Sequence, residues 1–142
     1  MKNFFLIAFV SMMLTSCNND SGDNILPAYA MEGKWVFPAD IPGIGEQGIS
    51  NTMYLFEDGI RYTYYCTSEL SDDCKSLYES FEAADGNHIP GTNNYTFENN
   101  ILNVDLNFGN ELVTPITFEC DGGKAYFETP RYSLIRLGSS CD

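Results

Sequence analysis

Short runs of aromatic and β-branched residues recur along the chain after residue 31, and Gly, Asn and Asp separate them. This composition is typical of β-strands joined by tight turns. Alternation is clearest over residues 101–107, where Leu102, Val104 and Leu106 share one face of an extended chain. The pattern predicts eight strands, at residues 32–37, 52–57, 60–66, 94–98, 101–107, 111–120, 124–128 and 131–137.

The residues between consecutive runs indicate how the strands are connected. Three connections are Glu57-Asp58-Gly59, Asn99-Asn100 and Asp121-Gly122-Gly123. Asn, Asp and Gly tolerate the positive φ angles of hairpin turns. Strands joined in this way are antiparallel neighbours, and the simplest topology for them is an up-and-down meander. We therefore expect one all-β domain, an eight-stranded antiparallel meander barrel.

Strand periodicity lapses between residues 67 and 91. Ser71-Asp72-Asp73 is typical of a helix N-terminus, and the apolar residues that follow it lie three or four positions apart: Leu77, Tyr78, Phe81 and Ala84. The spacing predicts one short amphipathic helix within a long loop. A loop of this length is expected either to pack as a lid or to form a ligand gate or a partner surface.

The first 17 residues follow a different pattern. Lys2 precedes an apolar run over residues 4–14, which is shorter than the roughly 20 residues of a membrane-spanning helix. Leu14-Thr15-Ser16-Cys17 resembles the lipobox of bacterial lipoproteins, which implies cleavage before Cys17 and lipidation of that residue. We expect a signal peptide at 1–16, a lipidated flexible tether at 17–31 and the barrel domain at 32–142. The protein would then be an outer-membrane lipoprotein of the cell envelope, on either the periplasmic or the surface face. The alternatives are an ordinary cleaved signal and a retained helix.

Four further cysteines follow Cys17, an even number that predicts two disulfides in an oxidising compartment. A zinc site is the alternative, but the chain has no C-x-x-C pair and one histidine. In a meander the chain changes ends at every turn. Cys66 ends the third strand, whereas Cys120 and Cys141 follow strands that run the other way. The pairs expected are therefore Cys66–Cys74 and Cys120–Cys141.

The same change of direction sorts the loops between the two ends of the barrel. The long connections at 37–51 and 67–93 fall at one end, and the tight turns and the tether fall at the other. We expect a mouth that points away from the membrane.

Gly33-Lys34-Trp35 on the first strand resembles the Gly-x-Trp motif of lipocalins, in which the Trp closes the barrel floor beneath an arginine of the last strand. Arg136 is the residue at that position here. The layout over residues 32–137 is similar to the small lipocalin-like lipoproteins of Bacteroidetes. The resemblance implies a Trp35–Arg136 floor pair and a calyx that either holds a small hydrophobic ligand or is filled by its own side chains. At the mouth we expect the ligand to contact aromatic residues of the strands and the long loop: Phe37, Tyr62, Tyr64, Tyr78 and Phe81.

The formal net charge of −13 opposes binding to nucleic acid and to anionic lipid. Hydrolase motifs such as Gly-x-Ser-x-Gly and calcium-binding series are missing from the sequence, and His88 has no identifiable catalytic partner. We expect no enzyme activity, no metal and no cofactor. Two functions remain: a binding module for a small hydrophobic ligand, or an acidic lipoprotein that binds or inhibits a cationic envelope protein.

Overall fold

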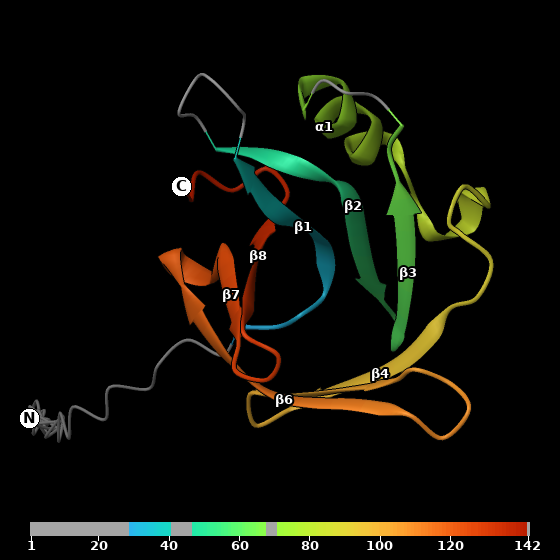
Figure 1. Ribbon diagram of the computed structural model, residues 1–142, viewed down its shortest axis with the longest axis vertical. Coiled ribbons are helices and arrows are strands. Elements are labelled where there is room, and N and C mark those ends of the chain that lie inside the picture. The colour runs from blue at the N-terminus through green and yellow to red at the C-terminus, as the bar shows by residue number, and fades with distance from the viewer. Residues whose placement is uncertain (1–28, 41–46, 68–70, 142) are drawn as a thin grey trace, which may run out of the picture.

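The computed structural model describes residues 29–40, 47–67 and 71–141. The predicted signal peptide, Cys17 and most of the predicted tether therefore lie outside the described residues. These described residues form eight strands and one α-helix (Figure 1). The strands are β1 (Gly33–Asp40), β2 (Gln47–Glu57), β3 (Ile60–Tyr65), β4 (Asn93–Glu98), β5 (Ile101–Asp105), β6 (Glu111–Glu119), β7 (Lys124–Phe127) and β8 (Tyr132–Arg136). The helices are α1 (Ser71–Ser80) and the 3-10 turns η1 (Ala83–Asp85) and η2 (Cys120–Gly122).

Each strand pairs antiparallel with the next, and β1 pairs with β8 to close the barrel. This confirms the predicted eight-stranded antiparallel meander with one short helix. The hairpin turns use the expected residues, since Asp58 and Gly59 have φ angles of 51° and 76°, and Asn99 and Asn100 of 51° and 61°. Two seams of the barrel are short: β1 pairs with β8, and β3 with β4, through two residue pairs each.

Two hydrophobic cores lie on opposite faces of the barrel wall. Successive residues of a strand point to opposite faces, so β2 contributes Tyr54 and Phe56 to one core and Met53 and Leu55 to the other. The inner core fills the barrel with Met31, Trp35, Phe56, Tyr95, Leu102, Val104, Ile116, Ala125, Phe127 and Leu134. The outer core consists of Val36, Met53, Leu55, Tyr64, Cys66, Cys74, Tyr78, Ile135 and Cys141.

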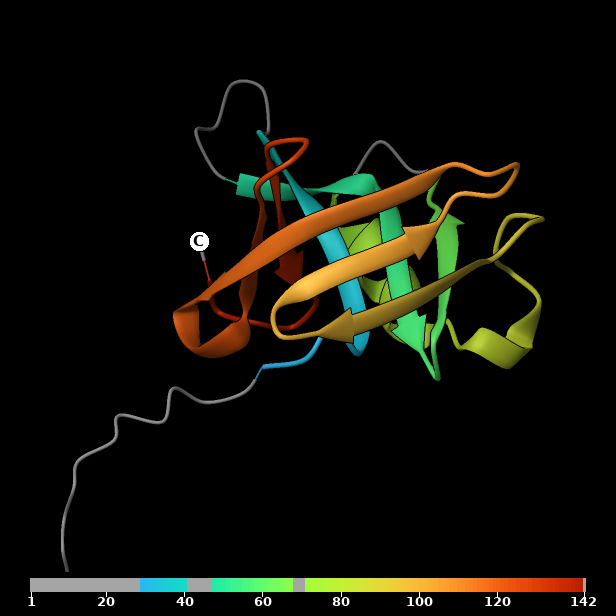
Figure 2. The same ribbon diagram turned by 90° about the horizontal axis from the view of Figure 1, so that it is seen from below.

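The helix α1 packs on the outside of the barrel. In Figure 2 it lies behind β1 and β2, on the side away from β4, β5 and β6. Cys74 and Tyr78, four residues apart on one helix face, are buried in the outer core. The predicted apolar stripe is wrong at two of its members, because Leu77 is 39% exposed and Ala84 is also exposed. The disulfide from Cys74 to Cys66 turns the Cys74–Tyr78 face toward the sheet, and the helix ends at Ser80.

Trp35 and Arg136, the two residues of the expected floor pair, lie opposite each other where β1 pairs with β8, and we call this end of the barrel the floor. The guanidinium carbon of Arg136 lies 4.5 Å from the centroid of the Trp35 ring, a cation–π contact. Arg136 Nη1 donates to the Glu32 carbonyl at 2.7 Å and Nη2 to the Ala30 carbonyl at 2.8 Å. The indole Nε1 donates to the carbonyl of Met31 at 2.7 Å. The floor therefore joins the first and last strands to the chain segment that enters the barrel.

That entering segment corrects the predicted boundary between tether and domain. Met31 is 1% exposed within the inner core, and the ring of Tyr29 lies 5.5 Å from that of Phe118. The segment has no strand or helix period, so the sequence pattern assigned it to the flexible tether. It is nonetheless part of the fold, because its apolar side chains cover the floor and its carbonyls accept from Trp35 and Arg136.

Gly33 permits the close approach of Arg136 to the first strand. Its φ is +111°, and a Cβ atom there would lie 2.8 Å from Arg136 Nη1. We expect Gly33→Ala to lower the free energy of unfolding by roughly 2 kcal/mol, from backbone strain together with displacement of the guanidinium. Gly109→Ala is the matched control, because Gly109 also has a positive φ (+79°) but no atom within 4 Å of the added Cβ. It should cost about 1 kcal/mol. Equal losses in urea titrations of the two variants would contradict a contact-specific role for Gly33.

Candidate functional site

Both predicted disulfides are present. Cys66 and Cys74 are joined at 2.04 Å and Cys120 and Cys141 at 2.07 Å. The first bridge connects the end of β3 to α1, and the second fastens the C-terminal segment to the turn between β6 and β7. Neither bridge lies inside the barrel. They position the elements around the site and take no part in lining it.

The five residues expected to contact a ligand divide between the two faces of the wall. Phe37 packs against the inner core, whereas Tyr62, Tyr64, Tyr78 and Phe81 belong to the outer core or pack against it. The prediction that these five residues line one mouth is therefore corrected. Tyr62 and Tyr64 occupy the outward positions of β3, and the Cys66–Cys74 bridge folds the following chain back over them. The Tyr64 and Phe81 rings stack with centroids 4.9 Å apart. Through this pair the long loop covers the outer wall of the barrel and not its mouth.

Two buried tyrosines of the outer core have raised pKa values. Burial, reinforced by the nearby Asp85 carboxylate, raises the pKa of Tyr64 to about 12. Burial also raises the pKa of Tyr78 to about 12, against the opposing effect of a backbone hydrogen bond. Tyr64 Oη donates to the Glu82 carbonyl at 2.9 Å, and Tyr78 Oη donates to the Ser50 carbonyl at 3.3 Å. Both hydroxyls thereby connect the loop or helix to the barrel wall.

These pKa values predict alkaline destabilisation of the outer core. A phenol whose folded pKa is raised from 10 to about 12 contributes stability that is complete below pH 10 and is lost as the pH rises through 12. We expect the free energy of unfolding to fall between about pH 10 and 12, and to fall less in Tyr78→Phe than in wild type. Urea titrations at several pH values, together with ultraviolet difference absorbance, measure both effects. Ionisation of all tyrosines near pH 10, as in a free peptide, would contradict this prediction.

The inner wall carries an aromatic group that we call the mouth cluster: Phe37, Tyr54, Phe127 and Tyr132. The Phe37 centroid lies 5.5 Å from that of Tyr54 and 5.5 Å from that of Tyr132. Tyr132 in turn stacks on Phe127 at 4.2 Å. The four rings come from β1, β2, β7 and β8, and three of them, all except Phe127, remain partly exposed.

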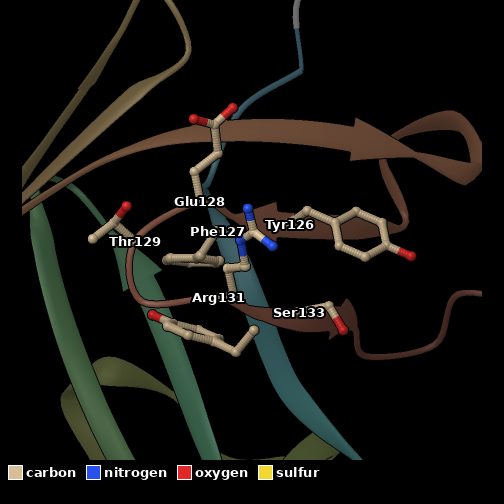
Figure 3. A pocket seen from close by; sticks show the side chains of 7 residues that line it. Tyr126, Phe127, Glu128, Thr129, Arg131 and Ser133 are labelled. Carbon is tan, nitrogen blue, oxygen red and sulfur yellow. The ribbon is translucent and has the colours of Figure 1, made fainter.

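An open pocket of about 730 Å³ lies at the β7–β8 hairpin beside the mouth cluster. The described residues that line it are Tyr126, Phe127, Glu128, Thr129, Arg131, Tyr132 and Ser133. In Figure 3, Phe127 points to one side of the hairpin, while Tyr126 and Ser133 point to the other. The pocket is thus lined from both faces of the hairpin, and it shares Phe127 and Tyr132 with the mouth cluster.

A cationic side chain also points into the barrel. Arg61 lies on the inward face of β3, and its guanidinium carbon is 4.8 Å from the Tyr54 centroid. Its Nη2 donates to Asn93 Oδ1 at 2.5 Å, whereas its buried Nε has no hydrogen-bond partner. Burial lowers the pKa of Arg61, and burial raises the pKa of Tyr132. Both shifts reflect the poorly solvated interior that the two side chains share.

Sequence reasoning left Arg61, Tyr54 and Tyr132 out of the candidate site. The alternation along β3 contained the necessary signal, since Arg61, Thr63 and Tyr65 fall opposite Tyr62 and Tyr64. It did not show which of the two sets points inward. The Arg61 side is the inner one, because α1 covers the other face.

Other candidate chemistry is sparse in the described part of the chain. His88 packs edge-on against Tyr62 at 5.1 Å, and its Nδ1 lies 2.9 Å from the Ile89 carbonyl. Among residues 29–40, 47–67 and 71–141, no group of three or more His, Cys, Asp or Glu side chains is arranged to hold a metal ion. In the same ranges, no helix has the length and apolar character needed to cross a membrane.

Comparison of the chain with protein-family models, with curated proteins and with solved structures finds no match. The geometry of the barrel and its mouth cluster is therefore the basis for assigning a function.

Proposed function

We propose that the protein is a non-catalytic binding module of the cell envelope that holds a small, largely apolar ligand at the open end of its barrel. The mouth cluster carries this proposal: three partly exposed aromatic rings contact one another on the inner wall, and one of them, Tyr132, lines a pocket of about 730 Å³. Concave sites lined by aromatic rings with a few polar groups are the usual form of small-molecule sites. Lipidation at Cys17 would hold the module at the membrane.

The distribution of packing within the barrel supports an end-on site. From its floor to its middle the barrel is filled by Trp35, Phe56, Tyr95 and Leu134, all buried. Tyr54, Tyr132 and Leu112 also pack against the inner core, but they are only partly buried. A ligand would therefore stack on the mouth cluster above the filled middle. It would not occupy a deep calyx.

Titration with a neutral apolar fluorophore, N-phenyl-1-naphthylamine, tests the proposal. The full chain carrying Cys17→Ser is used, so that no attached lipid competes for the probe. We expect saturable binding at one site and about fivefold weaker binding in Tyr132→Ala, because a lost ring contact is worth about 1 kcal/mol. Tyr62→Ala is the matched control, since Tyr62 is a partly buried tyrosine on the outer face of the wall. It should leave the affinity within twofold.

Equal weakening in both variants, or no saturable binding to the wild type, would contradict a site at the mouth cluster. In the second case the alternative, a protein-binding role for the acidic surface, becomes the better explanation of the net charge of −13. That role predicts binding of a basic protein that weakens steeply with added salt.

A further inference from the structure

Arg61 has fewer hydrogen-bond and ion-pair partners in the barrel than its charged side chain can use. Its guanidinium carries five N–H donors, and within the described residues its one hydrogen bond is the 2.5 Å contact from Nη2 to the neutral Asn93 amide. The buried Nε makes no hydrogen bond, and no carboxylate of the described residues forms an ion pair with Arg61. Buried charges in proteins are normally paired, because burial removes the solvent that stabilises them.

The position of Arg61 relates it directly to the mouth cluster. Its guanidinium lies against the ring of Tyr54, which contacts Phe37 at 5.5 Å. Asn93 begins β4, and Tyr95, two residues further along the same face, is already buried in the inner core. Arg61 therefore lies at the boundary where the filled middle of the barrel ends and the partly exposed rings begin.

We propose that Arg61 binds the carboxylate head of an amphipathic anion whose apolar body stacks on the mouth cluster. This inference rests on the proposed function and specifies its ligand class. A guanidinium matches the two oxygens of a carboxylate and forms charge-assisted hydrogen bonds with it. Such a head group would supply the negative partner that the described protein groups do not, and the Tyr54 and Tyr132 rings would exclude water from the pair.

The acidic exterior does not oppose this contact at short range. The charges that make up the net −13 are screened over about 8 Å at physiological ionic strength. At the mouth cluster, the Arg61 guanidinium carbon lies 4.8 Å from the Tyr54 centroid, and two exposed side chains of opposite charge, Glu128 and Arg131, line the adjoining pocket. The acidic exterior lowers the association rate of anions, whereas contact with Arg61 slows the dissociation of a ligand that carries a carboxylate.

A pair of probes that differ only in charge tests this inference. A polyene fatty acid and its methyl ester share one chromophore, and both are titrated into the full chain carrying Cys17→Ser. We expect the acid to bind at least tenfold more tightly than the ester, since hydrogen bonds to charged groups are worth about 1.4 kcal/mol or more. In Arg61→Gln this preference should disappear, with ester affinity changed less than twofold. Arg131→Gln, which removes an exposed arginine of the same pocket, should keep the preference.

The outcomes separate the two proposals. Equal binding of acid and ester to the wild-type barrel overturns the role of Arg61 and leaves the binding module in place. Loss of the acid preference in Arg131→Gln, with retention in Arg61→Gln, assigns the anion to the outer hairpin and also overturns it. Failure of both probes to bind overturns the proposed function itself. The wild-type comparison needs no variant, so it decides the question even where Arg61→Gln does not fold.

Discussion

Replacing Trp35 by alanine is expected to lower the free energy of unfolding by about 3–5 kcal/mol, as for other large aromatic residues removed from a packed core. The side chain is 0% exposed, and its ring holds three neighbours in place at the floor. Arg136 stacks on its face, Met31 accepts its N–H, and Phe118 lies 6.1 Å from its centroid. The loss thus combines a cavity, a broken cation–π contact and an unpaired carbonyl.

Far-UV circular dichroism during urea titration is the appropriate measurement, because Trp35 is the single tryptophan and its fluorescence disappears with it. Phe108→Ala provides the control. Phe108 is fully exposed at the turn between β5 and β6, and its removal should change stability by no more than about 0.5 kcal/mol. A Trp35→Ala variant within about 1 kcal/mol of wild type would show that the floor is not a main source of stability.

Removing the Cys120–Cys141 bridge is expected to cost about 3 kcal/mol, because the bridge closes a loop of 21 residues and restricts the unfolded chain. The double variant Cys120→Ala/Cys141→Ala leaves Cys66–Cys74 intact, so oxidised protein can be compared directly in urea. The C-terminal segment keeps other contacts, since Ser139 Oγ donates to the Gly123 carbonyl at 3.3 Å and Arg136 N to the same carbonyl at 2.8 Å.

Those contacts define the control and the contradicting result. Ser139→Ala removes a hydrogen bond of the segment and retains the disulfide, and it should cost about 1 kcal/mol or less. If the double variant loses no more than Ser139→Ala, the C-terminal segment is held by hydrogen bonds and packing, and the covalent link contributes little.

The strands and their order followed from residues that are near one another in the sequence. The run over residues 101–107 alternates with period two, and the turns at Asp58-Gly59 and Asn99-Asn100 have residues that accept positive φ. With the direction of each strand known, the disulfide partners followed from parity. The predicted strand ends were less accurate: β2 begins at Gln47, five residues before its predicted start.

Which residues line the candidate site depends on contacts between distant parts of the chain, and the sequence pattern does not show these contacts. Tyr62 and Arg61 are adjacent in sequence, yet one lies beneath the loop that follows α1 and the other inside the barrel. Periodicity divides a strand into two faces without identifying the inner one when both faces carry large side chains. The same limit placed Tyr78 and Phe81 at the mouth, although they cover the wall from outside.

The fold class, the strand order and the disulfide pairs could be predicted from the sequence, because each depends on local periodicity, turn residues or strand direction. The Trp35–Arg136 contact was expected only from the resemblance to lipocalins. Contacts between distant parts of the chain place α1 outside the barrel, Met31 at the floor and Arg61 beside the mouth cluster, and none of these positions could be predicted from the sequence. The reason is that both faces of the barrel wall carry large side chains, and each side chain is buried only where another element packs against its face. On the outer face that element is α1, which a disulfide folds back onto the wall, and on the inner face it is the opposite strands.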